Sequence, residues 1–373
     1  MMKLLLTASA ATIAATGAYA GGIERSAGSV ALLFEKGNYA ELSFGSVNPS
    51  VSGVQAIPFP LAPGVVLPAG ASSGEVAKSY TALTLGVKQQ VNDKIAIAVI
   101  IDQPIGADVS YGPGTGYLYG VGAGSQAAID AVAATALVHY RFSDAFSIYG
   151  GIKGEQVSGK VALFNGYTMN TSKEIDYGYL VGAAYERPDI ALRVGLTYAS
   201  AITHKFDVTE NGAPSLPFES EVPQSVTLDF QSGIAANTLL FGSVRWRDWS
   251  AFDITPVGFA AATGGSLVSY DNDAITYNIG VGRKFSDAWS AAITVGHEKS
   301  NGGFAGNLGP TDGYTSVGVG ATYTHGNMKL TGGVSYVWIG DAQTEAPGAP
   351  GVALANFDDN SALGVGFKAG FSF

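Results

Sequence analysis

Five basic side chains occupy positions from which they could bind an anion. Each lies in a segment that alternates apolar with small or polar residues, on the face opposite the apolar one; they are Lys88, Arg141, Lys153, Arg193 and Arg245. A guanidinium or ammonium group there can hold the carboxylate of an amphipathic ligand by charge-assisted hydrogen bonds, and Arg193 and Arg245 are the main candidates. The alternative is an internal ion-pair network that braces the wall, with Glu155, Asp176 or Asp229 as partners.

The sequence gives little support for a catalytic site or a metal site. A hydrolase needs a nucleophile beside a base, but His139, His204, His297 and His325 lie in no G-x-S-x-G context, and we interpret all four as surface or rim residues. No clustered metal ligands are evident, and the chain has no Cys. The sequence therefore predicts a protein that is not an enzyme and carries no metal or cofactor.

The composition is rich in glycine and poor in charge. Of 373 residues, 51 are Gly and only 13% are charged, which is about half the usual charged fraction. An apolar content of 47% excludes intrinsic disorder, and a net charge of −10 argues against a nucleic-acid partner. These values fit a soluble all-β protein or a membrane β-barrel.

The first twenty residues have the pattern of a secretory signal peptide. Lys3 precedes an apolar run, and Ala18-Tyr19-Ala20 supplies the small residues of an A-x-A cleavage site. An N-terminal core helix is the alternative, but the chain turns polar directly afterwards. We therefore expect residues 1–20 to be a signal peptide and the exported chain to begin at Gly21.

Alternation with a period of two residues runs through the rest of the chain. Residues 275–282 place Ile, Tyr, Ile and Val on one face and Thr, Asn and Gly on the other. The second face is rich in Gly, Ala, Ser and Thr rather than in the Lys and Glu of a solvated surface. The pattern predicts fourteen strands, at residues 39–47, 79–92, 94–103, 133–143, 146–161, 173–187, 189–207, 220–235, 238–254, 273–285, 289–299, 313–325, 327–342 and 361–373.

The connections alternate between tight turns and longer loops, as is typical of outer-membrane barrels. The longer ones are expected at residues 48–78, 104–132, 162–172, 208–219, 255–272, 300–312 and 343–360. We predict an all-β fold, a closed transmembrane β-barrel of about 14 antiparallel strands over residues 39–373, because an even count leaves no free edge in lipid. The aromatic terminus Phe373 fits the signal that barrel-assembly machinery reads, so that machinery is an expected partner during biogenesis.

Residues 21–38 precede the first strand and are too few for a domain. Fourteen strands enclose a lumen wider than the filled interior of an eight-stranded barrel, and it would leak if nothing occupied it. We predict that residues 21–38 form a short N-terminal hatch that plugs the lumen. A disordered periplasmic tail is the open alternative.

Several passages, in order along the chain, resemble the FadL-type outer-membrane transporters, a family that moves long-chain fatty acids and other hydrophobic compounds. They are residues 37–49, the D-x-P-x-G-A segment at 102–107, residues 222–226, the W-x-x-W-S-x-F run at 246–252, and residues 280–285. The family fold is a fourteen-stranded barrel. The resemblance implies that the third strand kinks inward around Asp102, Pro104 and Gly106 and opens a lateral hole in the wall. A simple strand end at the rim is the alternative, since proline is confined to edges, strand starts and bulges.

Two departures from the family pattern concern the hatch and the capture site. The hatch is short here and lacks the family's Asn-Pro-Ala motif. The loops that form the family's capture groove are also short, at residues 162–172 and 208–219. The Pro-rich residues 48–78 or the Ala-rich residues 125–135 are candidates to take over capture.

The residues and the resemblance together predict a passive outer-membrane channel for hydrophobic or amphipathic small molecules, such as long-chain fatty acids. Ligand would be captured at the extracellular loops and released through the lumen or the lateral opening. A general diffusion porin and a structural or adhesive barrel are the alternatives, although loop 104–132 has only Asp108 and Asp130 as charged residues, few for a porin constriction. We expect a monomer surrounded by outer-membrane lipid and lipopolysaccharide.

Overall fold

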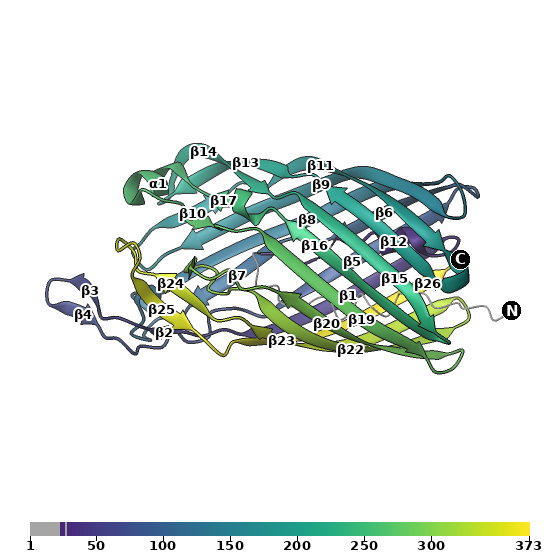
Figure 1. Ribbon diagram of the computed structural model, residues 1–373. Helices are drawn as coiled ribbons and strands as arrows, with labels where there is room; N and C mark the ends of the chain where they lie inside the picture. The colour runs from purple at the N-terminus through teal and green to yellow at the C-terminus, as the bar shows by residue number, and fades with distance from the viewer. Residues whose placement is uncertain (1–22, 27) are drawn as a thin grey trace.

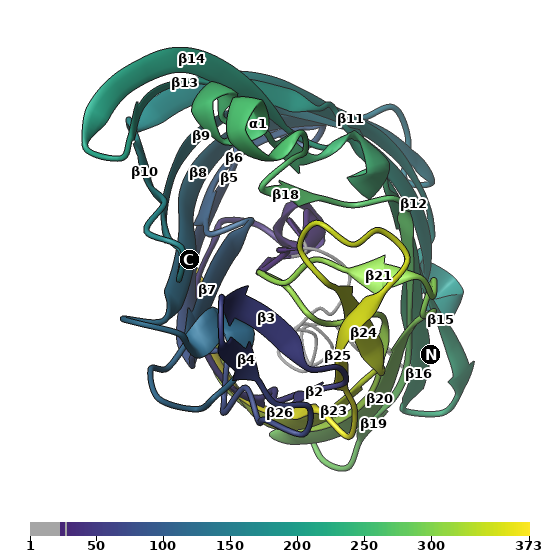
Figure 2. The same ribbon diagram turned by 90° about the vertical axis from the view of Figure 1, so that its left-hand side faces the viewer.

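The computed structural model describes residues 23–26 and 28–373, so the expected signal peptide, residues 1–20, lies outside the described residues. Fourteen strands form one closed antiparallel barrel (Figures 1 and 2), which confirms the predicted fold class. In barrel order they are β1 (Tyr39–Ser50), β5 (Tyr80–Gln90), β6 (Ile95–Asp102), β8 (Ser125–Arg141), β9 (Phe146–Ala162), β11 (Glu174–Arg187), β12 (Leu192–Ala199), β15 (Ser225–Ala235), β16 (Thr238–Arg247), β19 (Ala274–Lys284), β20 (Trp289–Glu298), β22 (Tyr314–His325), β23 (Met328–Ile339) and β26 (Ser361–Ser372). The barrel closes where β26 pairs with β1, from Tyr39–Ser372 to Ser50–Ser361.

The barrel strands present apolar residues outward and small or polar residues inward. On β26, Leu363, Val365 and Phe367 are about half exposed, whereas Ala362 and Lys368 are buried. Closure gives the backbone of every strand a neighbour on both sides, as lipid surroundings require. None of the helices in the described part of the chain is long and apolar enough to span a membrane.

The longer connections contain more regular structure than the sequence predicted. They gather at one end of the barrel, here called the loop end, and the C-terminus lies at the opposite, turn end (Figure 1). Strands from three of them form a small four-stranded sheet in the order β2-β25-β24-β21. The elements outside the barrel order are β2 (Val54–Gln55), β3 (Phe59–Ala62), β4 (Val65–Leu67), η3 (Leu118–Gly120), β10 (Thr168–Thr171), η4 (Pro188–Ile190), η5 (Trp249–Ala251), β17 (Asp253–Ile254), α1 (Val257–Thr263), β18 (Val268–Ser269), β21 (Phe304–Ala305), β24 (Ala342–Glu345) and β25 (Ala353–Phe357).

Two of the expected loops are wrong in extent. The loop expected at residues 104–132 contains β7 (Gly106–Tyr111) and the first residues of β8, which pair with each other. The loop expected at residues 208–219 belongs to a hairpin of β13 (Ile202–Glu210) and β14 (Ala213–Val222). Residues 211 and 212 at its tip have φ angles of 52° and 78°, as a type I′ turn with the sequence Asn-Gly requires.

The single strand expected at residues 189–207 is also wrong, because the chain breaks between β12 and β13. At this break, the apolar residues change from the outward face of the wall to the inward face. On β12, the apolar Leu196 is exposed on the outside, whereas on β13 Phe206 is buried inside and Lys205 is exposed. A charged exterior and an apolar interior suit water rather than lipid, so the hairpin of β13 and β14 extends the wall beyond the apolar band.

The N-terminal segment, defined as residues 23–26 and 28–38, lies inside the ring of strands (Figure 2). It contains the 3-10 helix η2 (Ala31–Phe34), whose Leu32 and Leu33 are buried. A Cβ added at Gly86 of β5 would come within 3.1 Å of Leu32. A residue without a side chain on the wall therefore lets this segment pack closely against β5.

Candidate functional site

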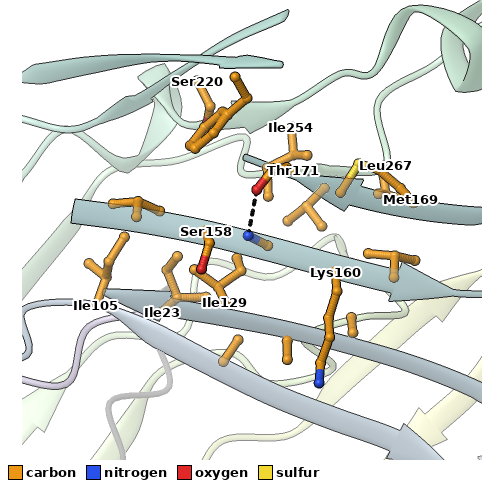
Figure 3. Close-up of a pocket in the computed structure, with 18 of the residues that line it drawn as sticks. Ile23, Ile105, Ile129, Ser158, Lys160, Met169, Thr171, Ser220, Ile254 and Leu267 are labelled. Atoms are coloured by element: carbon orange, nitrogen blue, oxygen red, sulfur yellow. Dashed lines mark hydrogen bonds between the residues drawn. The ribbon is translucent and has the colours of Figure 1, made fainter. Parts of the chain in front are cut away.

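An apolar cavity lies at the loop end, with an empty volume of about 730 Å³, part of which is open solvent (Figure 3). Its wall combines β8, β9 and β10 with the β13–β14 hairpin and the segment between β16 and β19. Most of the lining side chains are aliphatic or aromatic, among them Ile23, Ile129, Met169, Phe206, Phe218 and Ile254. Each ligand methylene buried there would contribute about 0.8 kcal/mol. The Ala-rich residues 125–135 contribute to this wall through residues 127–129, whereas residues 48–78 do not line it.

One buried carboxylate ties the segment that carries α1 to the β13–β14 hairpin beside the apolar cavity. Glu210, at the tip of β13, accepts hydrogen bonds from the backbone N–H groups of Gly258 and Phe259 in α1, both at 2.8 Å. It also accepts the hydroxyls of Tyr167 at 2.7 Å and Ser215 at 2.5 Å. Burial alone would raise the pKa of Glu210, but these hydrogen bonds lower it below its ordinary value. The carboxylate thereby ties the α1 segment to the hairpin.

A polar cavity lies deeper in the lumen, with an empty volume of about 1050 Å³ that also includes open solvent. It is lined by charged residues and by a number of Ser and Thr side chains; the charged residues are Glu24, Asp102, Lys153, Asp229, Arg245 and Arg247. This composition suits water, ions or the head group of an amphipathic ligand, and it contrasts with the hydrocarbon character of the apolar cavity.

The N-terminal segment contributes residues to both cavities. Ile23 lines the apolar cavity, and the next residue, Glu24, lines the polar one. Oε1 of Glu24 lies 2.8 Å from Nη2 of Arg245 and 3.8 Å from Nη1 of Arg247. Glu24 and Arg247 are both less than 10% exposed, so these charges depend on one another for compensation.

The other predicted anchors divide between the N-terminal segment and the wall. Nζ of Lys88 donates to the backbone carbonyl of Glu35 at 2.5 Å, and the guanidinium of Arg193 lies 4.4 Å above the ring of Phe34. Lys153 forms an ion pair with Glu155 within the wall. Arg141 is half-buried and lines neither cavity. Three of the five predicted cations, Arg245 included, therefore contact the N-terminal segment, and their binding of a ligand stays a prediction.

The barrel wall is interrupted where the sequence carries Asp102, Pro104 and Gly106. The ladder between β5 and β6 ends at Leu85–Ile101, and pairing on that side resumes only at the isolated bridge Ala77–Val109. On the other side, β6 and β7 both pair with β8, so the third strand continues past the break. Asp102 ends β6, Pro104 lies in the break between β6 and β7, and Gly106 begins β7. An inward kink with a lateral opening at this break stays a prediction.

The N-terminal segment occupies the lumenal side of this break. The backbone N–H groups of Arg25 and Ser26 both donate to the carbonyl of Pro104, and the N–H of Gly106 donates to the carbonyl of Ile23 at 2.8 Å. The guanidinium of Arg25 lies 4.5 Å above the ring of Tyr80 on β5. A Cβ at Gly106 would meet that guanidinium at 2.6 Å, so a side chain at this position would force Arg25 to shift.

Sequence reasoning missed Arg247, Glu24 and two histidines. Arg247 stands two residues after Arg245 on the same strand, and this spacing was a usable signal, since residues i and i+2 share a face. The interpretation of all four histidines as surface residues is wrong, because His139 and His204 are only 2% and 1% exposed. Within the described residues, no group of three or more His, Asp or Glu side chains could hold a metal ion.

A closed antiparallel barrel of fourteen strands is a fold that this chain shares with solved structures. The chain has the FadL-type fold. It is similar over 92% of both chains to the crystal structure of a Pseudomonas aeruginosa FadL homologue, with a TM-score of 0.73 and 15% identity.

Two solved transporters are similar over almost the whole chain. The Pseudomonas putida toluene transporter TodX matches with a TM-score of 0.64 and 12% identity over 98% of both chains. The Ralstonia pickettii toluene transporter TbuX matches with a TM-score of 0.61 and 13% identity, over 97% of this chain and 98% of that one. No protein-family model matches the sequence, and no curated protein matches it.

Proposed function

We propose that the protein is a passive channel for hydrophobic or amphipathic small molecules in the bacterial outer membrane. The observation that carries this proposal is the apolar cavity at the loop end, with Ile23 of the N-terminal segment in its wall. The fold supports it, because the similar structures include a FadL homologue and two toluene transporters. A hydrocarbon or a fatty-acid chain fits the lining of the apolar cavity better than a hydrophilic solute does.

The proposed path leads from the apolar cavity past the N-terminal segment. A ligand carboxylate can replace Glu24 as the partner of Arg245 and Arg247, which weakens the hold on this segment. Release then follows through the lumen or sideways at the kink of the third strand. For the lateral route, Arg25 must leave the space between Tyr80 and Gly106.

Uptake in cells tests the proposal. The full chain, expressed in a Gram-negative host that lacks its own channel for such compounds, should increase uptake of a labelled long-chain fatty acid or of toluene. An Ile254→Asn variant, which puts an amide into the apolar cavity, should reduce the gain. Uptake equal to that of the empty host would contradict the proposal.

Ion conductance separates the proposal from a general diffusion porin. In planar bilayers, the full chain should carry little steady current, and deletion of residues 21–36 should raise it if this segment plugs the lumen. A large, steady current through the full chain would instead favour the porin. We further propose that the chain acts as a monomer in contact with outer-membrane lipid and lipopolysaccharide, after insertion by the barrel-assembly machinery.

A further inference from the structure

A buried histidine lines the apolar cavity, and nothing in the proposed path uses it. His204 lies on β13 among residues that face inward, and its side chain is only 1% exposed. Its ring stacks on that of Phe206 with centroids 5.8 Å apart, and both rings line the apolar cavity. An imidazole in such surroundings is costly unless both of its nitrogens find partners.

Among the described residues, neither ring nitrogen makes a hydrogen bond of good geometry, but one of them lies beside a carboxylate. Nδ1 lies 3.0 Å from Oδ2 of Asp176 on β11, whereas Nε2 is buried without a hydrogen-bond partner. A carboxylate beside Nδ1 stabilises the tautomer that carries its proton there. Nε2 is then left as a buried hydrogen-bond acceptor on a side chain that lines the apolar cavity.

We infer that His204 is the polar contact of this cavity for ligands that carry one neutral hydrogen-bond donor, such as a phenol or an alkanol. Nε2 accepts the ligand hydroxyl, while the apolar lining buries the hydrocarbon part. The inference rests on the proposed function and narrows its substrate class from hydrocarbons in general to hydroxylated ones.

The charges around His204 favour a neutral donor over an anion. Asp176 is in contact with the ring, and Glu155 stands directly opposite Asp176 across the β9–β11 ladder. One cation, Lys153, pairs with Glu155. Two carboxylates against one ammonium give the surroundings of His204 no excess positive charge to hold a ligand carboxylate. Lys160 also lines the cavity, but its side chain is exposed to solvent. The surroundings of His204 differ in this respect from the polar cavity with Arg245 and Arg247.

A pair of ligands that differ by one hydroxyl tests the inference. Binding of 4-hexylphenol and hexylbenzene to the full chain is measured by equilibrium dialysis near pH 8, where a phenol is neutral and an ordinary imidazole is uncharged. The ratio of the two affinities is then compared between the wild type and His204→Phe, which keeps an aromatic ring on Phe206. One neutral hydrogen bond predicts that this ratio falls about three- to tenfold in the variant.

Two further variants keep the test decisive. Asp176→Asn can donate to Nδ1 and so reverse the tautomer, and it should lower the same ratio even if His204→Phe does not fold. Ser158→Ala removes a different polar group from the same cavity and should leave the ratio unchanged. If both ligands bind and neither His204→Phe nor Asp176→Asn changes the ratio, the inference is wrong although the channel proposal stands. If neither ligand binds the wild type, the proposed function itself fails.

Discussion

The apolar cavity and the polar cavity share one barrel but differ in what builds them. The apolar cavity is formed largely where the wall extends beyond the apolar band, by the β13–β14 hairpin and the segment that carries α1. The polar cavity is formed by inward residues of the barrel strands, where Arg245 and Arg247 meet Glu24. Two consecutive residues, Ile23 and Glu24, belong to different cavities. We propose that the short N-terminal segment is the boundary between a site for hydrocarbon and a site for charge.

The largest effect is expected from breaking this boundary at Glu24. Glu24→Gln removes the carboxylate that lies against the guanidinium groups of Arg245 and Arg247, and loss of one partner of a buried ion pair typically costs about 3–5 kcal/mol. The docking equilibrium of the N-terminal segment should shift at least about a hundredfold toward release. Planar-bilayer conductance should rise accordingly.

The control for this experiment is Glu219→Gln, which makes the same chemical change on the exposed face of the hairpin. Its conductance should equal that of the wild type. Equal conductance of Glu24→Gln and the wild type would show that the ion pairs do not hold the boundary.

Removing a cation from the polar cavity should separate acidic from neutral ligands. Arg245→Ala deletes a charged hydrogen-bond donor, worth about 1.5–3 kcal/mol, so the affinity for a fatty acid should fall about ten- to hundredfold more than that for a matched hydrocarbon. Arg193→Ala should act in the same direction but more weakly, because Arg193 stacks on Phe34 and does not line the cavity. Equal losses for both ligands in calorimetric titrations would assign these arginines to structure.

A polar side chain in the apolar cavity should mainly lower the affinity for hydrocarbons. Ile254→Asn places in the lining an amide that a bound hydrocarbon cannot hydrogen-bond. Removing water from this amide costs about 1–3 kcal/mol, so the affinity for a hydrocarbon should fall about tenfold. Ile254→Leu keeps the apolar volume and serves as the control. Bilayer conductance should be unchanged in both variants, and a parallel change in conductance would mean that the two cavities are not separate.

The smallest of these effects is expected from loss of the negative charge of Glu210. Its pKa is lowered in the folded protein, so its contribution to stability is present above the ordinary Glu pKa of about 4.3 and is lost as the pH falls through the lower folded value. Hydrogen exchange at Gly258 and Phe259, extrapolated to a common pH, should therefore show weaker protection in acid. Glu210→Gln should weaken protection above this pH range by about 1–2 kcal/mol and should remove its dependence on pH. Protection that does not respond to either change would show that Glu210 does not hold the α1 segment.

The barrel was predictable from sequence, whereas the boundary between the cavities was not. Alternating apolar residues, as in residues 275–282, suffice to place strands because lipid imposes a strict outward face. The β13–β14 hairpin was missed although Asn211-Gly212 is a strong hairpin signal. Its apolar residues face inward, whereas those of the other strands face outward, so a pattern that assumes outward apolar residues assigns part of the hairpin to a loop. The pairing of Glu24 with Arg245 joins residues far apart in the chain, and no local pattern encodes such a contact.

The burial of His204 shows the same limit on a smaller scale. Ile202, His204, Phe206 and Val208 alternate along β13 and share one inward face. The spacing was visible in the sequence, but the direction of the face depends on where the wall leaves the lipid. That position is set by the break after β12 and not by the residues of β13 alone.

The central claim is that the N-terminal segment closes a channel built for apolar ligands. It is tested most directly by the steady ion conductance of the full chain in planar bilayers, compared with the chain that lacks residues 21–36. We predict little current through the full chain and a large, steady current after the deletion. A large current through the full chain, or equal currents from both, would contradict the claim.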